Sequence, residues 1–210
     1  MKVPFARRRS EGGAESGAVR TRIVSHARRH FFAHGFRGVT MDDIASDLGL
    51  SKKTLYVHFA SKAELLRAVI LAKFESVQHD FDGLARRGEA DFEARLQGML
   101  ECLQRHLQEA QPAFVRDMKR EPEMFQWIQA LRRENVERSI GRLFEECRRT
   151  GLIRKDVPIR VAIEILMGAI EAVVHPQKLE ELGLTPQAAF PMVMTVVLEG
   201  MLTAKGRSRS

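Results

Sequence analysis

Apolar residues recur at helical spacing through most of the chain, and no stretch shows the apolar–polar alternation of a half-buried strand. Glycine and proline interrupt this pattern and divide it into separate helices. The pattern predicts an all-α fold. Helices are expected at 19–34, twice within 40–62, at about 62–80, and near 90–110, 112–119, 122–149, 158–174 and 186–204. Pro191 leaves two interpretations of the last helix, because the helix either starts there or is kinked one turn after Thr185 caps it.

The stretch 40–62 combines two helix starts with a tight turn. Thr40 is a natural N-cap, and Asp43 three residues later is placed to close a capping box with it. Gly49 suits the left-handed geometry that ends the first short helix, and Ser51 suits the N-cap of the next one. Apolar residues at helical spacing in both helices would hold them together. Two short helices with so short a connection predict a helix-turn-helix, whose second helix enters the DNA major groove.

The run from Gly49 to Lys62, Gly-Leu-Ser-Lys-Lys-Thr-Leu-Tyr-Val-His-Phe-Ala-Ser-Lys, resembles the DNA-binding signature of the TetR family of transcriptional regulators. The likeness covers about the first third of the chain, fades after about Leu66, and includes upstream Ile23, Ala27, Phe31, Gly35, Phe36 and Thr40. The resemblance implies that phosphates are contacted by Thr40, Tyr56, His58 and Lys62. It also implies that base edges face Lys52, Lys53 and Thr54. Lysines at the start of such a helix suit guanine edges or phosphates on chemical grounds as well.

The charge of this chain of 210 residues and 23.8 kDa is unevenly distributed. Residues 1–62 hold twelve Lys or Arg against five Asp or Glu, a balance of +7, whereas residues 63–210 hold twenty-two of each. The net charge therefore belongs to the segment with the helix-turn-helix, which favours a polyanionic partner such as duplex DNA. A basic membrane-surface segment is the competing explanation, but the basic residues adjoin no Trp- or Leu-rich apolar face.

Two features of the N-terminal segment leave alternatives open. Residues 1–18 carry three consecutive arginines but almost nothing apolar to bury, so we expect a disordered arm. The arm is either an additional DNA contact or a solubilising tail. His26, His30 and His34 then recur every four residues, which is the spacing of metal ligands on a helix. With arginines around them and no acidic or cysteine ligand near them in the sequence, a solvated or partly packed face is favoured over a metal site.

The last two predicted helices are apolar around most of their circumference, so all of their sides need cover. A two-fold interface of four helices would supply this cover, with Gly168 and Gly200 allowing close approach. A fully internal core is the alternative. The resemblance also implies a homodimer, since TetR-like proteins dimerise through their two C-terminal helices. The predicted interface residues are Ile163, Met167, Ile170, Val193, Val197 and Met201.

Large, soft apolar residues are spread over the middle helices. Such residues build adaptable pockets, but they also build ordinary cores. The resemblance favours the pocket, because it implies a small-molecule site enclosed by these helices. Residues 114–118 are also faintly similar to AefR-like regulators, but this similarity does not indicate which ligand would bind. The predicted ligand-binding residues are Met99, His106, Phe114, Met118, Trp127 and Leu131.

Together these features predict a ligand-responsive transcriptional regulator. We expect it to bind palindromic operator DNA as a homodimer and to be released by a small apolar or aromatic molecule, and the resemblance implies that it is a repressor. The alternative is a DNA-binding regulator without a small-molecule inducer, controlled by a partner or by its abundance. No Gly-rich phosphate loop, nucleophile elbow or Ser/His/Asp grouping marks an enzyme, and no cofactor is expected.

The expected organisation follows from the same observations. A disordered arm at 1–18 precedes an N-terminal three-helix helix-turn-helix domain at 19–64, a C-terminal helical ligand-binding and dimerisation bundle at 65–204, and a tail at 205–210. The sequence shows neither a secretory signal nor an apolar run long enough to span a membrane, so we expect a cytoplasmic, nucleoid-associated protein. Cys102 and Cys147 are expected to be reduced core thiols, and a redox sensor is the alternative.

Overall fold

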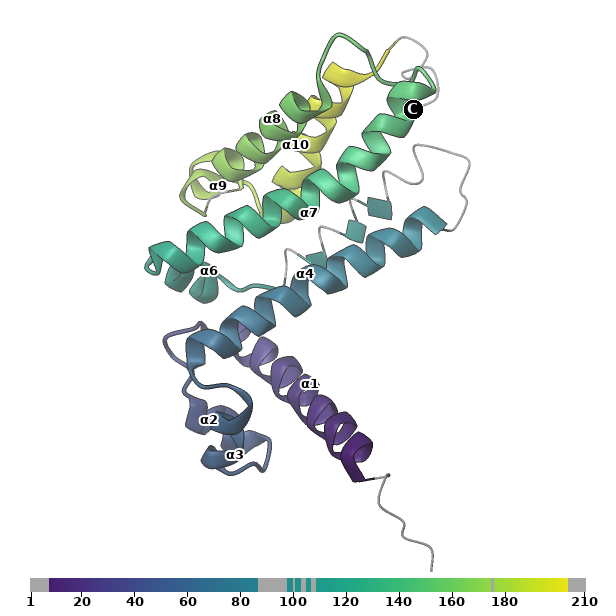
Figure 1. The fold of residues 1–210 in the computed structure, drawn as a ribbon. Coiled ribbons are helices and arrows are strands. Elements are labelled where there is room, and N and C mark those ends of the chain that lie inside the picture. The colour runs from purple at the N-terminus through teal and green to yellow at the C-terminus, as the bar shows by residue number, and fades with distance from the viewer. Residues whose placement is uncertain are drawn as a thin grey trace, which may run out of the picture. The chain divides into compact units, whose positions relative to one another are not determined.

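The computed structural model describes residues 8–86, 98–99, 101–102, 105–106, 109–174 and 176–203, with side chains for all of these except 8–15, 85–86, 176 and 186–187. Regular structure within these ranges is helical, apart from an isolated bridge between Ile153 and Leu202 (Figure 1). The predicted all-α class is confirmed. Residues 1–7, the expected tail at 205–210 and most of the helix expected near 90–110 lie outside the described residues.

The first four helices are α1 (Arg8–His34), α2 (Met41–Asp47), α3 (Lys52–His58) and α4 (Lys62–Arg86). Helices α2 and α3 start where the caps predicted, and α4 starts at the expected residue 62. By contrast, α1 includes residues 8–18, which were expected to be disordered. This corrects the expected arm over those residues. Their composition indicates little apolar surface to bury, but a helix that is already nucleated in its packed part can extend beyond it.

The later helices are α6 (Pro112–Lys119), α7 (Pro122–Arg149), α8 (Ile159–Val173), α9 (Pro176–Leu182) and α10 (Pro186–Met201). Four of them lie close to the predicted ranges, whereas α9 is not predicted. The signals for α9 are a proline at its first position and Gly183 just after its end, at φ 63°. Thr185 caps α10 by accepting a hydrogen bond of 3.3 Å from the N–H of Ala188. Pro191 therefore lies inside α10 and does not start it.

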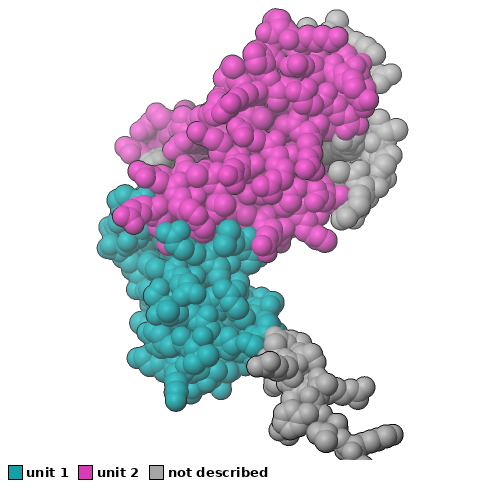
Figure 2. Space-filling view, in the orientation of Figure 1, with its two compact units in different colours: residues 1–73, 109–122 teal, residues 74–108, 123–210 magenta. Residues whose placement is uncertain are grey.

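The chain forms two compact units (Figure 2). Unit 1 comprises residues 1–73 and 109–122, and unit 2 comprises residues 74–108 and 123–210. The division therefore falls within α4, after Lys73, and it places α6 in unit 1 together with the N-terminal helices. None of the helices in the described part of the chain is long and apolar enough to cross a membrane.

The core of unit 1 joins the N-terminal helices. One side chain from each of α1 to α4 illustrates this, because Phe31, Ile44, Leu55 and Leu65 are all 0% exposed. Burial of a large apolar side chain stabilises a fold by roughly 1.5–3 kcal/mol, so these contacts hold the two short helices that would be marginal alone.

Helix α6 packs on α1 within unit 1. The rings of Phe114 and Phe32 lie with their centroids 4.8 Å apart, and the backbone N–H of Gln111 donates a hydrogen bond of 2.9 Å to the carbonyl oxygen of Phe32. Asp117 accepts a hydrogen bond of 2.8 Å from the backbone N–H of Arg37. These contacts explain why residues 109–122 belong to unit 1, although they follow part of unit 2 in the sequence.

The core of unit 2 is built mainly by α7, α8 and α10. Phe144, Leu166 and Phe190, one from each helix, are at most 1% exposed. The end of α10 is tied to the segment after α7, because the backbone N–H of Arg154 donates to the carbonyl oxygen of Met201 at 2.9 Å. Cys147 belongs to this core and Cys102 is also buried, and neither forms a disulfide within the described residues, so both lie in the core as expected.

Candidate functional site

A reciprocal capping box fixes the start of α2. Thr40 Oγ1 accepts a hydrogen bond of 3.1 Å from the backbone N–H of Asp43, and Asp43 Oδ2 accepts one of 2.8 Å from the backbone N–H of Thr40. The Thr40 hydroxyl also donates to this carboxylate oxygen, at 2.7 Å. The bonds from Thr40, led by the backbone one, lower the pKa of the Asp43 carboxyl. The predicted capping box is confirmed, and in this geometry the Thr40 hydroxyl donates to Asp43.

The turn between α2 and α3 also has the predicted geometry. Gly49 has φ 65°, and the backbone N–H of the next residue, Leu50, reaches back to the carbonyl oxygen of Ala45 at 2.9 Å. Ser51 Oγ accepts a hydrogen bond of 3.0 Å from the backbone N–H of Thr54, so Ser51 is the N-cap of α3. The opposite face of α3 is anchored, because Leu55 is 0% exposed. The first turn of α3 is therefore held at the protein surface in a defined orientation.

The exposed side of that turn carries two lysines in different states. Lys52 Nζ donates a hydrogen bond of 2.8 Å to Asp42 Oδ2, and this bond, with the charge of Asp42, raises the pKa of Lys52. Lys53 is exposed and forms no ion pair with another residue for which the structure gives a side chain. Thr54 is half-buried, and its hydroxyl lies 2.7 Å from Ser51 Oγ. Lys53 is therefore the cation of α3 that is readily available to an outside partner.

The rest of α3 adds one apolar group that is not among the predicted DNA-binding residues. Tyr56 is 42% exposed and His58 is half-buried, which leaves both near the surface, where they were expected. Val57 is 75% exposed, although it is a large apolar side chain on a helix with a buried face. Apolar side chains on a recognition helix contact the methyl group of thymine. The sequence held a signal for this contact, because Val57 is an apolar residue within the run from Gly49 to Lys62 that resembles a DNA-binding signature.

Lys62 occupies a different position from that expected of a phosphate contact. Its ammonium donates hydrogen bonds of 2.8 Å to the carbonyl oxygens of Phe36 and Val39, and it lies 4.4 Å from the centroid of the Phe36 ring. Burial lowers the pKa of Lys62, against the opposing charges of nearby carboxylates. The side chain thus ties the start of α4 to the loop before α2. We therefore assign Lys62 a positioning role in this structure.

Two arginines of α1 contact the ends of α2 and α3 and so support the helix-turn-helix. The sequence indicated them only through their contribution to the net charge. Arg22 donates a hydrogen bond of 2.8 Å to the carbonyl oxygen of Leu48, the C-cap of α2. The guanidinium of Arg20 lies 4.5 Å from the centroid of the Phe59 ring, which follows α3. Both contacts join residues far apart in sequence, so no local pattern could have indicated them.

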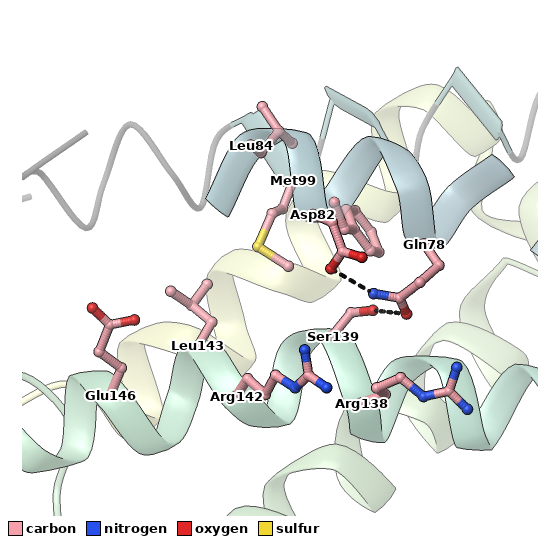
Figure 3. Close-up of a pocket in the computed structure, with 10 residues that line it drawn as sticks. Gln78, Asp82, Leu84, Met99, Arg138, Ser139, Arg142, Leu143 and Glu146 are labelled. Atoms are coloured by element: carbon pink, nitrogen blue, oxygen red, sulfur yellow. Dashed lines mark hydrogen bonds between the residues drawn. The ribbon is translucent and has the colours of Figure 1, made fainter. Parts of the chain in front are cut away.

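Unit 2 contains a cavity of about 190 Å³ (Figure 3). It lies between α4, α7 and the short helical segment 98–99, which follows α4 in the chain. Ser139 on α7 donates a hydrogen bond of 3.0 Å to Gln78 on α4, and Gln78 in turn donates one of 2.9 Å to Asp82 (Figure 3). Of the six predicted ligand-binding residues, Met99 lines the cavity. The full lining comprises Gln78, Phe81, Asp82, Leu84, Met99, Arg138, Ser139, Arg142, Leu143 and Glu146.

The other five predicted ligand-binding residues are not brought to this cavity. Phe114 and Met118 are buried on α6 in unit 1, where Phe114 contacts α1. His106 Nε2 lies 3.0 Å from Asp80 Oδ2. Trp127 and Leu131 are half-buried on α7 and do not line the cavity. Phe114 and Met118 are therefore core residues, because the amphipathic face of α6 packs on α1.

The predicted dimer residues lie mostly inside a single chain. Ile163, Ile170, Val193 and Met201 are 2–7% exposed and belong to the core of unit 2, and Met167 and Val197 are partly buried against it. Ile163, Ile170, Val193 and Met201 are therefore core residues, which corrects their assignment to an interface, whereas Met167 and Val197 remain predicted interface residues. The cause is that α8 and α10 pack on each other and on α7, which covers one side of each helix. The large apolar side chains that the described parts of these two helices leave exposed are Val161, Ile165, Met192 and Val196.

The histidine stripe of α1 has an acidic neighbour. His30 Nε2 lies 3.1 Å from Asp47 Oδ2 at the end of α2, and His26 Nε2 lies 3.7 Å from the same oxygen. Burial lowers the pKa of His26, and the charges of His30 and Arg29 lower it further, although Asp47 opposes them. The fold therefore brings an acidic ligand to the stripe from another helix, although none lies near it in the sequence.

The helix-turn-helix region is similar in sequence to known regulators. Residues 23–69 match the model of a family described as "Bacterial regulatory proteins, tetR family". The chain is 34% identical over 79 residues to the HTH-type transcriptional regulator TtgR of Pseudomonas putida, a stretch that covers 38% of this chain and 36% of TtgR. The match thus spans little more than a third of TtgR. The chain is also 25% identical over 201 residues to the regulator UidR of Escherichia coli, covering 90% of this chain and 96% of UidR.

Solved structures resemble most of the described fold. A transcriptional regulator from Cytophaga hutchinsonii has a TM-score of 0.69 at 20% identity and covers 89% of this chain and 100% of its own. A TetR transcriptional regulator from Chloroflexus aurantiacus has a TM-score of 0.65 at 20% identity, with 90% and 100% covered. The ketosteroid transcriptional regulator KstR2 of Mycobacterium tuberculosis has a TM-score of 0.55 at 19% identity, with 88% and 95% covered. At these identities the likeness concerns the fold.

Proposed function

We propose that this chain is a DNA-binding transcriptional regulator of the TetR family, and that it acts as a ligand-responsive repressor that binds palindromic operator DNA as a homodimer. The observation that carries the proposal is the surface position of the first turn of α3. Ser51 caps this turn, Leu55 anchors it, and Lys53 faces outward. A helix presented in this way enters the major groove with its N-terminal residues toward the bases.

The side chains of the helix-turn-helix divide into two groups in this proposal. Lys53 and Val57 face base edges, with Lys52 joining them when it exchanges Asp42 for DNA. Tyr56 and His58 donate to phosphates. The capped ends of α2 and α3 orient these groups. Lys62 contributes indirectly, because its hydrogen bond to the Val39 carbonyl oxygen holds the loop directly before α2 in place.

The face that we propose for the homodimer is the exposed apolar side of α8 and α10. On α8, Val161 and Ile165 are 47% and 55% exposed, and on α10, Met192 and Val196 are 55% and 73% exposed. Exposed apolar residues clustered in this way mark protein interfaces. A methyl group added at Gly168 or Gly200, on the same two helices, would meet nothing within 4 Å, so both glycines leave room for the close approach of a partner helix. A homodimer is also what a helix-turn-helix needs in order to read two half-sites.

The cavity of unit 2 supports control by a small molecule. Its volume of about 190 Å³ is below the roughly 300–1,000 Å³ of most ligand pockets, so we propose a small effector. Arg138 and Arg142 line it together with apolar Leu143, which suits a molecule with an apolar body and an anionic group. An effector that displaced the Ser139–Gln78 bond would change how α7 holds α4. The protein would then have two arrangements, one with the Ser139–Gln78 bond and one without it. The effector would relieve repression only as far as it binds the second arrangement more tightly than the first.

The experiment that tests DNA binding is a fluorescence-anisotropy titration at several salt concentrations. The probes are a duplex taken from the intergenic DNA beside the gene, chosen for an inverted repeat, and a scrambled duplex of the same composition. We expect tighter binding to the inverted repeat and a linear fall of log K with log salt for both probes. Equal affinity for both duplexes at every salt concentration would contradict a sequence-specific regulator.

The experiment that separates the effector hypothesis from control by a partner is a thermal-shift screen. The screen uses small carboxylates with apolar bodies, because a bound ligand raises the melting temperature by mass action. A hit is repeated on Met99→Trp, which fills the cavity, and on Trp127→Phe, which lies on α7 but does not line it. We expect the shift to disappear in Met99→Trp and to persist in Trp127→Phe. A screen without any hit favours the alternative of a regulator without a small-molecule inducer.

A further inference from the structure

We propose that His26, His30 and Asp47 form a binding site for a borderline divalent cation, of which Zn²⁺ is the best match, between α1 and the end of α2. His26 and His30 project from neighbouring turns of α1, and Asp47 is the last residue of α2. The two imidazole nitrogens and the carboxylate oxygen all lie within 4.8 Å of one another. Two histidines and a carboxylate, with one position left for water, are a set that holds Zn²⁺ in proteins.

The distances are close to those that a metal would impose. His30 Nε2 and Asp47 Oδ2 are 3.1 Å apart, and His26 Nε2 and the same oxygen are 3.7 Å apart. Ligand atoms at about 2.0–2.1 Å from a tetrahedral Zn²⁺ lie roughly 3.3 Å from each other. Small side-chain rotations therefore suffice to form the site. The Asp47 side chain is 49% exposed, so the fourth position would open to water.

A second and independent observation concerns His26 alone. Its Nε2 is buried and has no hydrogen-bond partner among the residues that the structure describes. Buried polar nitrogens in folded proteins are nearly always paired, so a partner that completes the bonding of this atom is expected. The same atom is one of the three in the proposed site. A cation shared with His30 and Asp47 would satisfy it.

Arg29 is the residue that competes with the metal. Its guanidinium lies 3.0 Å from His26 Nδ1, and a guanidinium only donates, so Nδ1 accepts and Nε2 carries the hydrogen. A metal at Nε2 requires the opposite tautomer, with the hydrogen on Nδ1. Arg29 is exposed, so it is able to turn into solvent when the tautomer changes. An acceptor at position 29 would instead favour the metal-binding tautomer, as acceptors behind metal-bound histidines do.

The position of the site indicates what the cation would do. Asp47 lies two residues before Gly49, where the chain turns from α2 into α3. A cation held by both helices would fix the end of α2 against α1 and thereby stabilise the placement of α3. This consequence rests on the proposed DNA-binding function, whereas the cation site itself does not.

Another group of metal-ligating side chains, Asp80, Cys102 and His106, lies in unit 2. The guanidinium of Arg105 lies 3.9 Å from the Asp80 oxygen of this group, and its positive charge opposes a cation there. This group matters for the experiment, because it must not be mistaken for the proposed site. A thiolate ligand gives Co²⁺ an additional near-ultraviolet absorption that histidine and aspartate do not give.

The test is a titration of the tag-free full-length chain, freed of metals with a chelator, with Co²⁺ and then with Zn²⁺. Visible absorption reports tetrahedral Co²⁺, and its loss reports displacement by Zn²⁺. Four variants are compared: His30→Gln and Asp47→Asn remove ligands, His34→Gln is the matched control on the same stripe, and Arg29→Gln supplies the acceptor. Far-ultraviolet circular dichroism reports whether each variant is folded.

We expect the wild-type chain to bind Co²⁺ without the thiolate band and to release it to Zn²⁺. His30→Gln and Asp47→Asn should weaken binding by at least about tenfold, His34→Gln should leave it unchanged, and Arg29→Gln should tighten it. Asp47→Asn keeps the shape of a half-exposed side chain, so it decides the result if His30→Gln does not fold. Equal binding by wild type and Asp47→Asn, or a thiolate band, would overturn the proposal.

The consequence for DNA is measured separately, by anisotropy with and without Zn²⁺. If DNA binding fails altogether while the metal titration succeeds, the proposed function is wrong and the cation site stands. If Zn²⁺ binds but leaves the DNA affinity of the wild type unchanged, the stabilising effect on α3 is overturned.

Discussion

The ammonium of Lys62 donates a hydrogen bond of 2.8 Å to the carbonyl oxygen of Val39, the residue directly before the N-cap of α2. A bond of equal length to the carbonyl oxygen of Phe36 completes the contact. Lys62 is the first residue of α4, so one side chain joins α4 to the loop that positions the capping box. The signature run of the sequence includes this lysine, and the structure gives it a role in holding the helix-turn-helix together.

The first prediction follows from this contact. Lys62→Met should lower the free energy of unfolding by about 1 kcal/mol, because two partly buried carbonyl groups lose their donor. The variant should retain nearly the wild-type salt dependence of DNA binding, since the Lys62 ammonium is already held by the carbonyl oxygens of Phe36 and Val39. Chemical unfolding and anisotropy at several salt concentrations measure the two effects.

Lys53→Ala is the control for Lys62→Met. Lys53 is exposed, so its removal should leave stability unchanged, and because we propose that it faces base edges, it should reduce the difference in affinity between operator and scrambled duplexes. If Lys62→Met flattened the slope of log K against log salt by about one without any loss of stability, the interpretation of Lys62 as a phosphate contact would be restored.

A second prediction concerns the pairing of Lys52 with Asp42 at 2.8 Å, with both side chains about 60% exposed. Asp42→Asn removes a negative charge from the DNA-facing side and releases Lys52. We expect DNA affinity to rise a few-fold at low salt for operator and scrambled duplexes alike, and the difference to vanish at high salt. Asp156→Asn, which removes the partner of Arg154 in unit 2, is the matched control and should not change DNA affinity.

The third prediction is a pH dependence of stability due to Glu109. Burial alone would raise the pKa of Glu109, but hydrogen bonds from Arg28, at 2.6 and 2.7 Å, and from Lys73, with the two charges, lower it below its ordinary 4.5. A carboxyl whose pKa is lowered by folding stabilises the folded state above its ordinary pKa and loses this effect as the pH falls through the lowered value. Glu109 therefore contributes fully at pH 7 and loses its contribution below about pH 4.5.

Glu109→Gln should lower the free energy of unfolding by about 1 kcal/mol at pH 7, a modest effect because the side chain is 34% exposed and solvent screens the pair. The difference from wild type should shrink as the pH falls from 5 to 3, which urea unfolding at several pH values would measure. Glu180→Gln, at an exposed site on α9, should match wild type throughout. A constant difference between wild type and Glu109→Gln at all pH values would show that the charge of Glu109 is not the cause.

Some of the helix ends could be predicted from the sequence alone, because the residues that fix them bond to near neighbours in the chain. Thr40, Ser51 and Gly49 act on backbone groups within four residues, so their side-chain chemistry alone predicted the ends of α2 and the start of α3. The same holds for Thr185 at the start of α10. Caps and turns are predictable from sequence because their partners are near in the chain.

The remaining features depend on partners that are distant in the chain. Lys62 bonds to residues more than twenty positions away, and Asp47 reaches His30 from the other side of a turn. In α8 and α10 the apolar pattern surrounds the helix, so the sequence could not tell the side that meets α7 from the side left exposed. Tertiary packing makes that choice, and it placed Ile163 inside and Ile165 outside.

The last prediction tests that exposed side as a dimer interface. Val196→Glu places a charge on α10 where the valine is 73% exposed, so the single chain should fold normally. In a homodimer packed through α8 and α10, the same charge would be buried without a partner, which is strongly destabilising to the interface. We expect the variant to be monomeric by sedimentation at concentrations where wild type is dimeric, and to lose its preference for the inverted repeat because a monomer holds one half-site at a time. Leu182→Glu, at a 52% exposed site on α9, should remain dimeric. A dimeric Val196→Glu would mean that the two chains meet elsewhere, and that the exposed apolar residues of α8 and α10 serve another contact.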